Sequence, residues 1–277
     1  MGFQTTDVAA LLPVLEAFLA DDDKVEKLFD EIDTATPQLQ DPSVAPFVLN
    51  RDLFDNTMVP DESRCAPGVN GVSVAGFFVT QCPPMDNSRI NPIPFMGLFQ
   101  SINFVISFEP VDLSRLYGTP GAKEDTGDYT MQRFTFLEHA YTQFCVKCPD
   151  HGVPANPKAL VDILDIVDGQ PTLSHCLAGV GRSFIPILYR MMMLKIENGE
   201  PLDFGEIMRE MRERRPGALQ THEQFSFAIK MVTEKLSRSI SVEKSNPDAK
   251  RKGSEKEKGE DKKSKPDVAE HDHPSSP

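Results

Sequence analysis

Apolar residues recur at three- and four-residue spacing through residues 7–33, and the run Asp21-Asp22-Asp23 interrupts them. This pattern predicts two short helices. Residues 40–100 differ, because Pro, Asn, Asp and Gly separate short apolar runs such as Val72–Val79. These runs predict strands joined by loops.

Strand-like patterns come first in the rest of the chain, and helix-like patterns come later. Apolar or alternating runs predict strands at residues 104–108, 129–136, 143–147 and 171–175. Helical spacing predicts helices at residues 158–167, 183–197, 204–214 and 221–236. Thr221 and Gln224 form a capping box for the last helix. This order predicts an α/β fold with α+β character, in which helices flank a mixed, twisted β-sheet.

The chain loses its apolar periodicity at Glu243, after which Lys, Glu, Asp, Ser and Pro dominate. We therefore expect a single folded domain over residues 1–242 and a disordered, charged tail over residues 243–277. No apolar run reaches 18 residues, so no membrane span is predicted. Five cysteines and an N-terminus without a secretory signal favour reduced thiols and a cytoplasmic, or else a nuclear, location.

Acidic residues outnumber basic residues by 42 to 29, which gives a formal net charge of −13. The predicted tail holds nine acids and nine bases. The whole excess of negative charge therefore lies in residues 1–242. Such a domain argues against nucleic acid as the main partner.

Residues His175–Ser183 read H-C-L-A-G-V-G-R-S and join a predicted strand to a predicted helix N-terminus. Backbone N–H groups and the helix dipole make such a loop positive, which favours the thiolate of Cys176. Gly179 and Gly181 let the backbone curl. Arg182 offers a planar fork of donors that can hold two phosphate oxygens. The alternative interpretation is a buried structural cysteine with an unrelated arginine nearby.

This run resembles the signature loop of the cysteine-based protein tyrosine phosphatases. Cys148-Pro-Asp-His-Gly-Val-Pro resembles their mobile acid loop, W-P-D-x-G-x-P, which makes Asp150 the matching general acid. The segment starting at Arg215 resembles R-x-G-x-x-Q-T-x-x-Q of the tyrosine-specific branch, whose glutamines match Gln220 and Gln224. The resemblance spans residues 45–236 and indicates a divergent, shortened, non-receptor-like catalytic domain.

The resemblance implies a mechanism through a phosphocysteine. Cys176 attacks phosphorus, Asp150 protonates the leaving tyrosine oxygen, and Gln220 places the water that hydrolyses the intermediate, with Gln224 in a secondary role. Ser183 assists the departure of Cys176, and His175 tunes the thiolate. Arg182 and the loop bind the phosphate, the loop residues being Leu177, Ala178, Gly179, Val180 and Gly181. The implied partners are phosphotyrosine-containing proteins, and no metal or organic cofactor is needed.

Several positions depart from the family pattern. Cys148 replaces the tryptophan of the acid loop, and Leu177 and Phe184 add bulk to the signature loop. In the recognition loop, Phe54 can stack on a phenyl ring and Asn56 falls at the peptide-binding position. These departures leave a second interpretation open, a pseudophosphatase that binds phosphotyrosine or a partner with little or no turnover.

Cys145 and Cys148 form a C-x-x-C pair, which in other proteins binds zinc or carries redox chemistry. A structural zinc site needs four ligands, and the sequence has no second pair. We therefore interpret the spacing as a coincidence. One hypothesis remains, a reversible disulfide between Cys148 and Cys176 that protects the nucleophile from over-oxidation.

Overall fold

The computed structural model describes residues 2–3, 8–36, 66, 69–84, 92–149 and 152–245. It begins with two helices, α1 (Val8–Leu19) and α2 (Asp22–Ala35), which confirms the pair predicted from the spacing. The acidic run between them provides the break, because the Asp21 side chain accepts a hydrogen bond from Lys24 N at 3.1 Å and caps α2.

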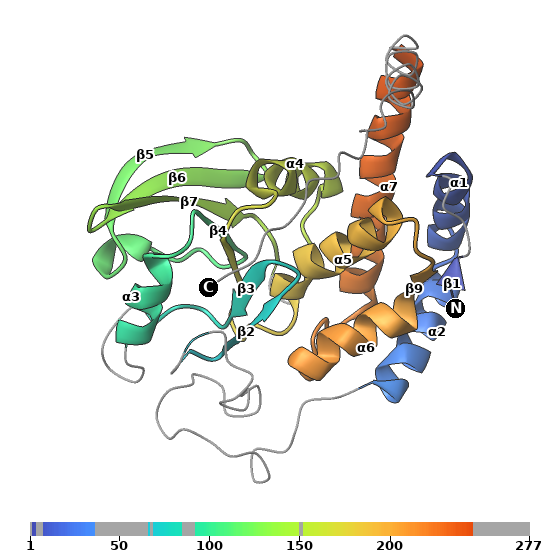
Figure 1. The fold of residues 1–277 in the computed structure, drawn as a ribbon, viewed down its shortest axis with the longest axis horizontal. Coiled ribbons are helices and arrows are strands. Elements are labelled where there is room, and N and C mark those ends of the chain that lie inside the picture. The colour runs from blue at the N-terminus through green and yellow to red at the C-terminus, as the bar shows by residue number, and fades with distance from the viewer. Residues whose placement is uncertain are drawn as a thin grey trace, which may run out of the picture. The chain divides into compact units, whose positions relative to one another are not determined.

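A seven-stranded mixed sheet forms the centre of the fold (Figure 1). Its strands are β2 (Gly71–Val74), β3 (Phe77–Thr80), β4 (Phe104–Ser107), β5 (Thr119–Asp125), β6 (Tyr129–Phe136), β7 (His139–Val146) and β8 (Thr172–His175). Their order is β2-β3-β8-β4-β7-β6-β5. The inner neighbours β3, β8, β4 and β7 run parallel, and the outer pairs are antiparallel. A short two-stranded sheet pairs β1 (Gly2–Phe3) with β9 (Leu202–Asp203).

The remaining helices lie between the strands and after them in the chain. They are α3 (Ile93–Phe99), η3 (Leu113–Arg115), α4 (Pro157–Val167), η4 (Arg182–Phe184), α5 (Ile185–Glu197), α6 (Phe204–Arg214) and α7 (His222–Ser245). The chain divides into two units, Met1–Ser237 and Arg238–Pro277, and the first holds the whole sheet. No helix among the described residues has the length and apolar character that crossing a membrane requires.

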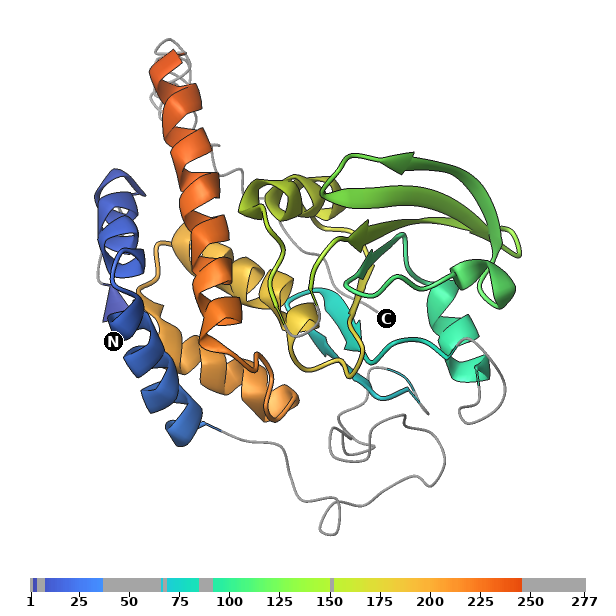
Figure 2. The same ribbon diagram turned by 180° about the vertical axis from the view of Figure 1, so that it is seen from behind.

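Two apolar clusters lie on opposite faces of the sheet, as the alternation of side chains along a strand requires. On β4, Val105 belongs to the cluster with α3, whereas Ile106 belongs to the larger cluster with α1, α2 and α4–α7. Figures 1 and 2 show α3 on the far side of the sheet from α1 and α2. Helices thus flank a mixed sheet, which confirms the predicted fold class.

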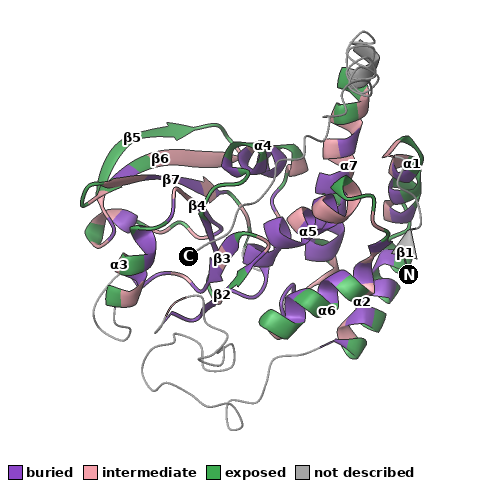
Figure 3. Ribbon diagram, viewed as in Figure 1, coloured by how far each residue is buried: buried purple, intermediate pink, exposed green. Residues whose placement is uncertain are grey.

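Some elements differ from the prediction. Strand β5 was not predicted, because all seven of its residues are exposed and they show no apolar alternation (Figure 3). Helix α3 lies in a proline-rich stretch where loops and strands were expected. The apolar run Val72–Val79 is a hairpin that turns at Ala75 and Gly76, both with positive φ. Helix α7 continues to Ser245, three residues into the predicted tail, and residues 246–277 lie outside the described part.

Candidate active site

Four parallel strands end at one edge of the sheet and place the candidate residues there. The register aligns Thr80 on β3, His175 on β8, Ser107 on β4 and Cys145 on β7 in a single row. Because parallel strands bring their carboxyl ends together, the residues that follow this row share one edge. That edge therefore receives Cys82, Cys176, Glu109 and Cys148.

The signature loop follows β8, and its carbonyl groups are tied to surrounding segments. Three of them accept hydrogen bonds from other segments: Leu177 O from Cys82 N (3.0 Å), Ala178 O from Arg215 (3.1 Å) and Val180 O from Leu219 N (2.7 Å). Within the described residues, the N–H groups of residues 177–181 have no protein acceptor. These N–H groups, followed at once by the helical segment from Arg182, form a place where an anion can bind.

Two glycines allow the loop to pass close to its neighbours. Gly179 has a φ of +72°, and a Cβ atom there would lie 2.4 Å from Gln81 N, in the chain that leaves β3. A Cβ atom on Gly181 would lie 2.7 Å from Gln220 Oε1 and 3.2 Å from Gln224 Nε2. Both glutamines therefore lie against the loop, and Gln224 Oε1 also accepts a hydrogen bond from Gln220 N at 3.0 Å.

Cys176 is the first loop residue and is buried, with 4% of its surface exposed. Its Sγ lies 3.4 Å from Ser183 Oγ, within hydrogen-bond reach. Ser183 O in turn accepts a hydrogen bond from Ser174 Oγ at 2.9 Å, which fixes the chain on both sides of the hydroxyl. The serine can therefore donate to a sulfur that gains negative charge.

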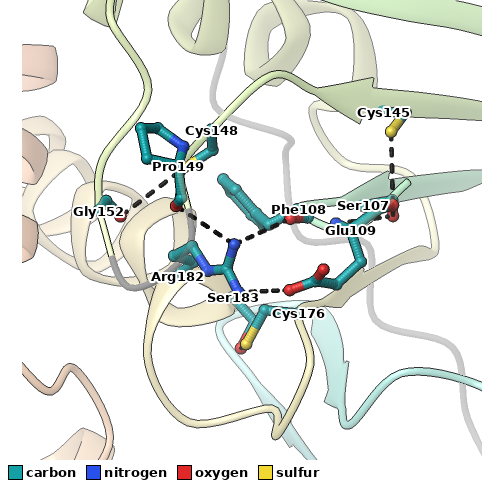
Figure 4. Close-up of polar contacts among 10 residues, drawn as sticks. All are labelled: Ser107, Phe108, Glu109, Cys145, Cys148, Pro149, Gly152, Cys176, Arg182 and Ser183. Carbon is teal, nitrogen blue, oxygen red and sulfur yellow. Dashed lines mark hydrogen bonds and ion pairs between the residues drawn. The ribbon is translucent and has the colours of Figure 1, made fainter. Parts of the chain in front are cut away.

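Arg182 brings its guanidinium into the same place (Figure 4). It donates to Phe108 O at 3.2 Å and to Pro149 O at 3.4 Å, and it forms an ion pair with Glu109. Only 6% of the Arg182 side chain and 20% of the Glu109 side chain are exposed. The segment after β4 and the acid loop therefore both contact the guanidinium of Arg182, which the signature loop carries.

Glu109 was not predicted as a site residue. It lies two residues beyond the end of β4, and its partner Arg182 is 73 positions away in the sequence. An acidic residue two positions beyond a buried strand is the only signal that the sequence offers. Asn70 was also missed. The Asn70 side chain accepts a hydrogen bond from Arg215 at 2.5 Å, and Arg215 also donates to Ala178 O in the loop. Asn70 therefore orients the arginine that binds the loop.

His175 is completely buried at the end of β8. Neither ring nitrogen of His175 has a hydrogen-bond partner in geometric reach among the described residues. No hydrogen bond there links the imidazole to the Cys176 sulfur. Burial lowers the pKa of His175 from 6.5 to about 3, and the backbone of Cys176 opposes part of this effect. The imidazole is therefore uncharged at neutral pH.

The acid loop is described only at its two ends. Cys148 Sγ lies 3.4 Å from both Pro149 O and Gly152 O, and Gly152 N donates to Pro149 O at 3.1 Å. The predicted general acid, Asp150, lies outside the described residues. The predicted recognition residues, Phe54 and Asn56, also lie outside them.

The C-x-x-C cysteines have different partners. Cys145 Sγ donates to Glu109 O at 3.4 Å, whereas Cys148 Sγ contacts the acid loop (Figure 4). Within the described segments, no three His, Cys, Asp or Glu side chains are grouped as metal ligands would be. That no metal or cofactor is needed stays a prediction.

Comparison with known proteins agrees with this geometry. The family model described as protein-tyrosine phosphatase matches residues 121–234. Mouse tyrosine-protein phosphatase non-receptor type 20 is 36% identical over 94 residues, which are 32% of this chain and 22% of that protein. Tyrosine-protein phosphatase 1 of Caenorhabditis elegans is 34% identical over 90 residues, 30% of this chain and 9% of that protein. Mouse receptor-type tyrosine-protein phosphatase N2 is 34% identical over 94 residues, 31% of this chain and 9% of that protein.

The chain therefore resembles the protein tyrosine phosphatase family over residues 121–234. It aligns with less than a quarter of the length of each of these relatives. The matched part contains the signature loop, the acid loop and both glutamines, whereas Phe54 and Asn56 precede it. The roles assigned to the individual site residues stay predictions.

Proposed function

We propose that this protein hydrolyses phosphotyrosine in protein substrates through a phosphocysteine intermediate. One observation carries the proposal. The Cys176 sulfur, the Ser183 hydroxyl and the Arg182 guanidinium meet at a loop whose own N–H groups have no acceptor within the described residues. This arrangement suits a nucleophile that attacks phosphorus while donors hold the phosphoryl oxygens.

In the first step, the Cys176 thiolate forms an S–P bond and the bond between phosphorus and the tyrosine oxygen breaks. Arg182 and the loop N–H groups stabilise the charge on the three equatorial oxygens. Asp150 donates a proton to the leaving tyrosine oxygen, which makes it a better leaving group. The ion pair between Arg182 Nη2 and Glu109 restricts the orientation of the guanidinium at the site.

In the second step, water replaces the cysteine on phosphorus. Gln220 lies against Gly181 and positions the water, and Asp150 takes its proton as the general base. The S–P bond breaks, and Ser183 donates a hydrogen bond to the departing sulfur. Phosphate then leaves, and the enzyme returns to its starting state.

The test is hydrolysis of a small aryl phosphate and of a phosphotyrosine peptide under reducing conditions, from mildly acidic to neutral pH. The variants are Cys176→Ser and Asp150→Ala. We expect no turnover by Cys176→Ser and strongly reduced turnover by Asp150→Ala, because one lacks the nucleophile and the other lacks the general acid. A folded wild-type protein that hydrolyses neither substrate would contradict the proposal and would favour the binding protein without turnover.

Binding separates the two roles of the loop. Cys176→Ser should still bind the phosphotyrosine peptide, because the loop N–H groups and Arg182 remain. Arg182→Ala should lose both binding and turnover, since the buried guanidinium is the cationic donor of the site. Unchanged peptide binding by Arg182→Ala, measured by calorimetry, would show that Arg182 does not hold the phosphate.

A further inference from the structure

Leu219, the residue directly before Gln220, has a backbone conformation that leucine rarely adopts. Its φ is +62°, and its side chain is completely buried in the larger apolar cluster. For a residue with a Cβ atom, the left-handed region is less favourable than the right-handed region by a factor of about 5–30. Two other described non-glycine residues have a positive φ, Ala75 and Leu137, and both lie in hairpin turns. Leu219 therefore differs from them because it lies in the core, against the candidate site.

Hydrogen bonds on both sides of Leu219 hold this conformation. Leu219 N donates to Val180 O of the signature loop at 2.7 Å, and Leu219 O accepts from Arg212 Nη2 at 2.9 Å. Arg212 Nε also donates to Ala218 O at 2.9 Å, so one guanidinium fixes two successive carbonyl groups. A strained residue keeps its conformation only where the surroundings over-determine it, and such residues gather at functional sites. The contacts of Leu219 meet this condition.

The conformation of Leu219 determines where Gln220 lies. The angle φ describes rotation about the N–Cα bond. Because Leu219 N is bound to Val180 O, a change of φ would move the carbonyl group of Leu219 and everything that follows it. In the observed conformation, a Cβ atom on Gly181 would lie 2.7 Å from Gln220 Oε1, and Gln220 N donates to Gln224 Oε1 at 3.0 Å. A negative φ at Leu219 would take the glutamine away from the loop.

We propose that Leu219 is a positioning residue for the second step of the reaction. Its left-handed backbone, held between Val180 O and Arg212, directs the side chain of Gln220 toward the phosphocysteine. The inference rests on the proposed function in one respect, the hydrolysis of a phosphocysteine with the help of Gln220. The first step does not use this glutamine, so a change at Leu219 should slow the second step and leave the first step intact.

Backbone strain and side-chain packing make opposite predictions for substitutions of Leu219. If the side chain only filled space, variants would rank by the volume that they keep, and valine would be better than glycine. Strain reverses this order. Valine is β-branched and is strongly disfavoured at positive φ, whereas glycine adopts positive φ without a steric cost. Leu219→Val should therefore relax to a negative φ and displace Gln220, and Leu219→Gly should keep the glutamine near its place.

The experiment mixes the full chain rapidly with para-nitrophenyl phosphate, follows the release of nitrophenol, and counts phosphocysteine by mass spectrometry of the intact protein after rapid denaturation. Gln220→Ala is the reference for loss of the second step. We expect Gln220→Ala and Leu219→Val to release a burst of nitrophenol and then to accumulate phosphocysteine. Their steady turnover should be about 10- to 100-fold slower than that of the wild type. Leu219→Gly should turn over about tenfold faster than Leu219→Val.

Leu98 on α3 provides the matched control, because it is buried in the other apolar cluster and its φ is not positive. Leu98→Val and Leu98→Gly should not accumulate phosphocysteine, and the valine variant should be the more stable of the two. Far-ultraviolet circular dichroism shows which variants are folded. If Leu219→Val does not fold, Leu219→Ala replaces it, because alanine also disfavours positive φ and should also be slower than Leu219→Gly.

Each contrary result has one meaning. If Leu219→Val hydrolyses the phosphocysteine faster than Leu219→Gly, the side chain acts by packing and the inference is wrong. If the variants of Leu219 lose the burst and not the second step, Leu219 supports the loop in general, and the inference is again wrong. In both cases the proposed function stands, because the wild type still turns over. If the folded wild type releases no nitrophenol, the proposed function itself fails, and this inference fails with it.

Discussion

Some positions of the signature loop tolerate almost no other residue type, and Gly179 is the clearest example. Gly179 has a φ of +72°, and a Cβ atom at this position would lie 2.4 Å from Gln81 N. Each of these two constraints alone disfavours other residues, and only glycine satisfies both. The positive φ alone costs another residue about 1–2 kcal/mol. The contact adds a clash with backbone atoms, which cannot rotate away as a side chain can.

We expect Gly179→Ala to lower the free energy of unfolding by about 3 kcal/mol or more and to abolish phosphate binding. Gly169→Ala is the matched control. Gly169 has a φ of +68°, but a Cβ atom there would meet nothing within 4 Å. Its cost should be only about 1–2 kcal/mol. Urea unfolding of both variants checks this, and equal costs would contradict the close packing of the loop.

His175 gives a pH dependence with a defined sign. Its pKa is 6.5 in the unfolded chain and about 3 when folded. Between these values the unfolded state binds more protons, so stability is lost as the pH falls below 6.5. At pH 5 the loss from this group is about 2 kcal/mol.

His175→Gln cannot take up a proton, so this variant should lose about 2 kcal/mol less than the wild type between pH 7 and pH 5. The measurement is urea unfolding at the two pH values, compared as a difference so that the cost of the substitution itself cancels. Parallel stability curves for the two proteins would contradict an uncharged, buried imidazole.

At the scale of elements, Arg212 on α6 fastens α2 to the segment that carries Gln220. Only 1% of its side chain is exposed. It donates to Ala218 O and Leu219 O at 2.9 Å each and to Thr36 Oγ1 at 2.8 Å, and it forms an ion pair with Asp33 at 2.7 Å. Thr36 is the C-cap residue of α2, and Leu219 directly precedes Gln220. The N-terminal helices therefore help to hold the glutamine segment.

Arg212→Met should destabilise the fold by about 3–5 kcal/mol, because it leaves several buried acceptors without a donor. Asp33→Asn should cost less than about 1 kcal/mol, since 42% of the Asp33 side chain is exposed to solvent. Chemical denaturation of both variants tests the contrast. A small effect of Arg212→Met would mean that α2 does not depend on this arginine.

Helix α6 was predicted at its true bounds because its apolar residues face the core at helical spacing. Strand β6 was also predicted at its true bounds, although Phe134 is its one buried residue. Strand β5 has no buried residue, and it is held by pairing with β6 and by an exposed ion pair between Asp125 and Lys147. Such pairing leaves no periodic signal in one segment.

The candidate site follows the same division. Cys176, Arg182 and Ser183 lie in one run, so the sequence displays them together. Glu109 contacts Arg182 because β4 and β8 are neighbours in the sheet. Arg212 donates to Thr36, which lies 176 positions away in the sequence. Pairs of this kind are created by tertiary structure and have no local pattern.

At the scale of the whole molecule, the charge of the first 242 residues predicts a preference among peptides. The formal net charge of −13 lies entirely in this part of the chain. A negative field attracts basic peptides and repels acidic ones, and salt screens it over about 8–10 Å.

We expect a phosphotyrosine peptide with basic flanking residues to show a higher kcat/KM than one with acidic flanking residues, by about tenfold at low salt. The ratio should approach one in 0.5 M salt. Steady-state kinetics with two peptides of equal length check this. A ratio that salt does not change would mean that local contacts, rather than the net charge, select the peptide.

The signature loop also separates two properties that are often equated, rigidity and protection of amides from hydrogen exchange. Its carbonyls are fastened to three other segments, which restricts the motion of the backbone. Its amides have no protein acceptor within the described residues, so water that reaches them can exchange their protons without any unfolding. Fast exchange at residues 177–181 would then report an empty anion site rather than a mobile loop, and slowing by inorganic phosphate would report its occupancy.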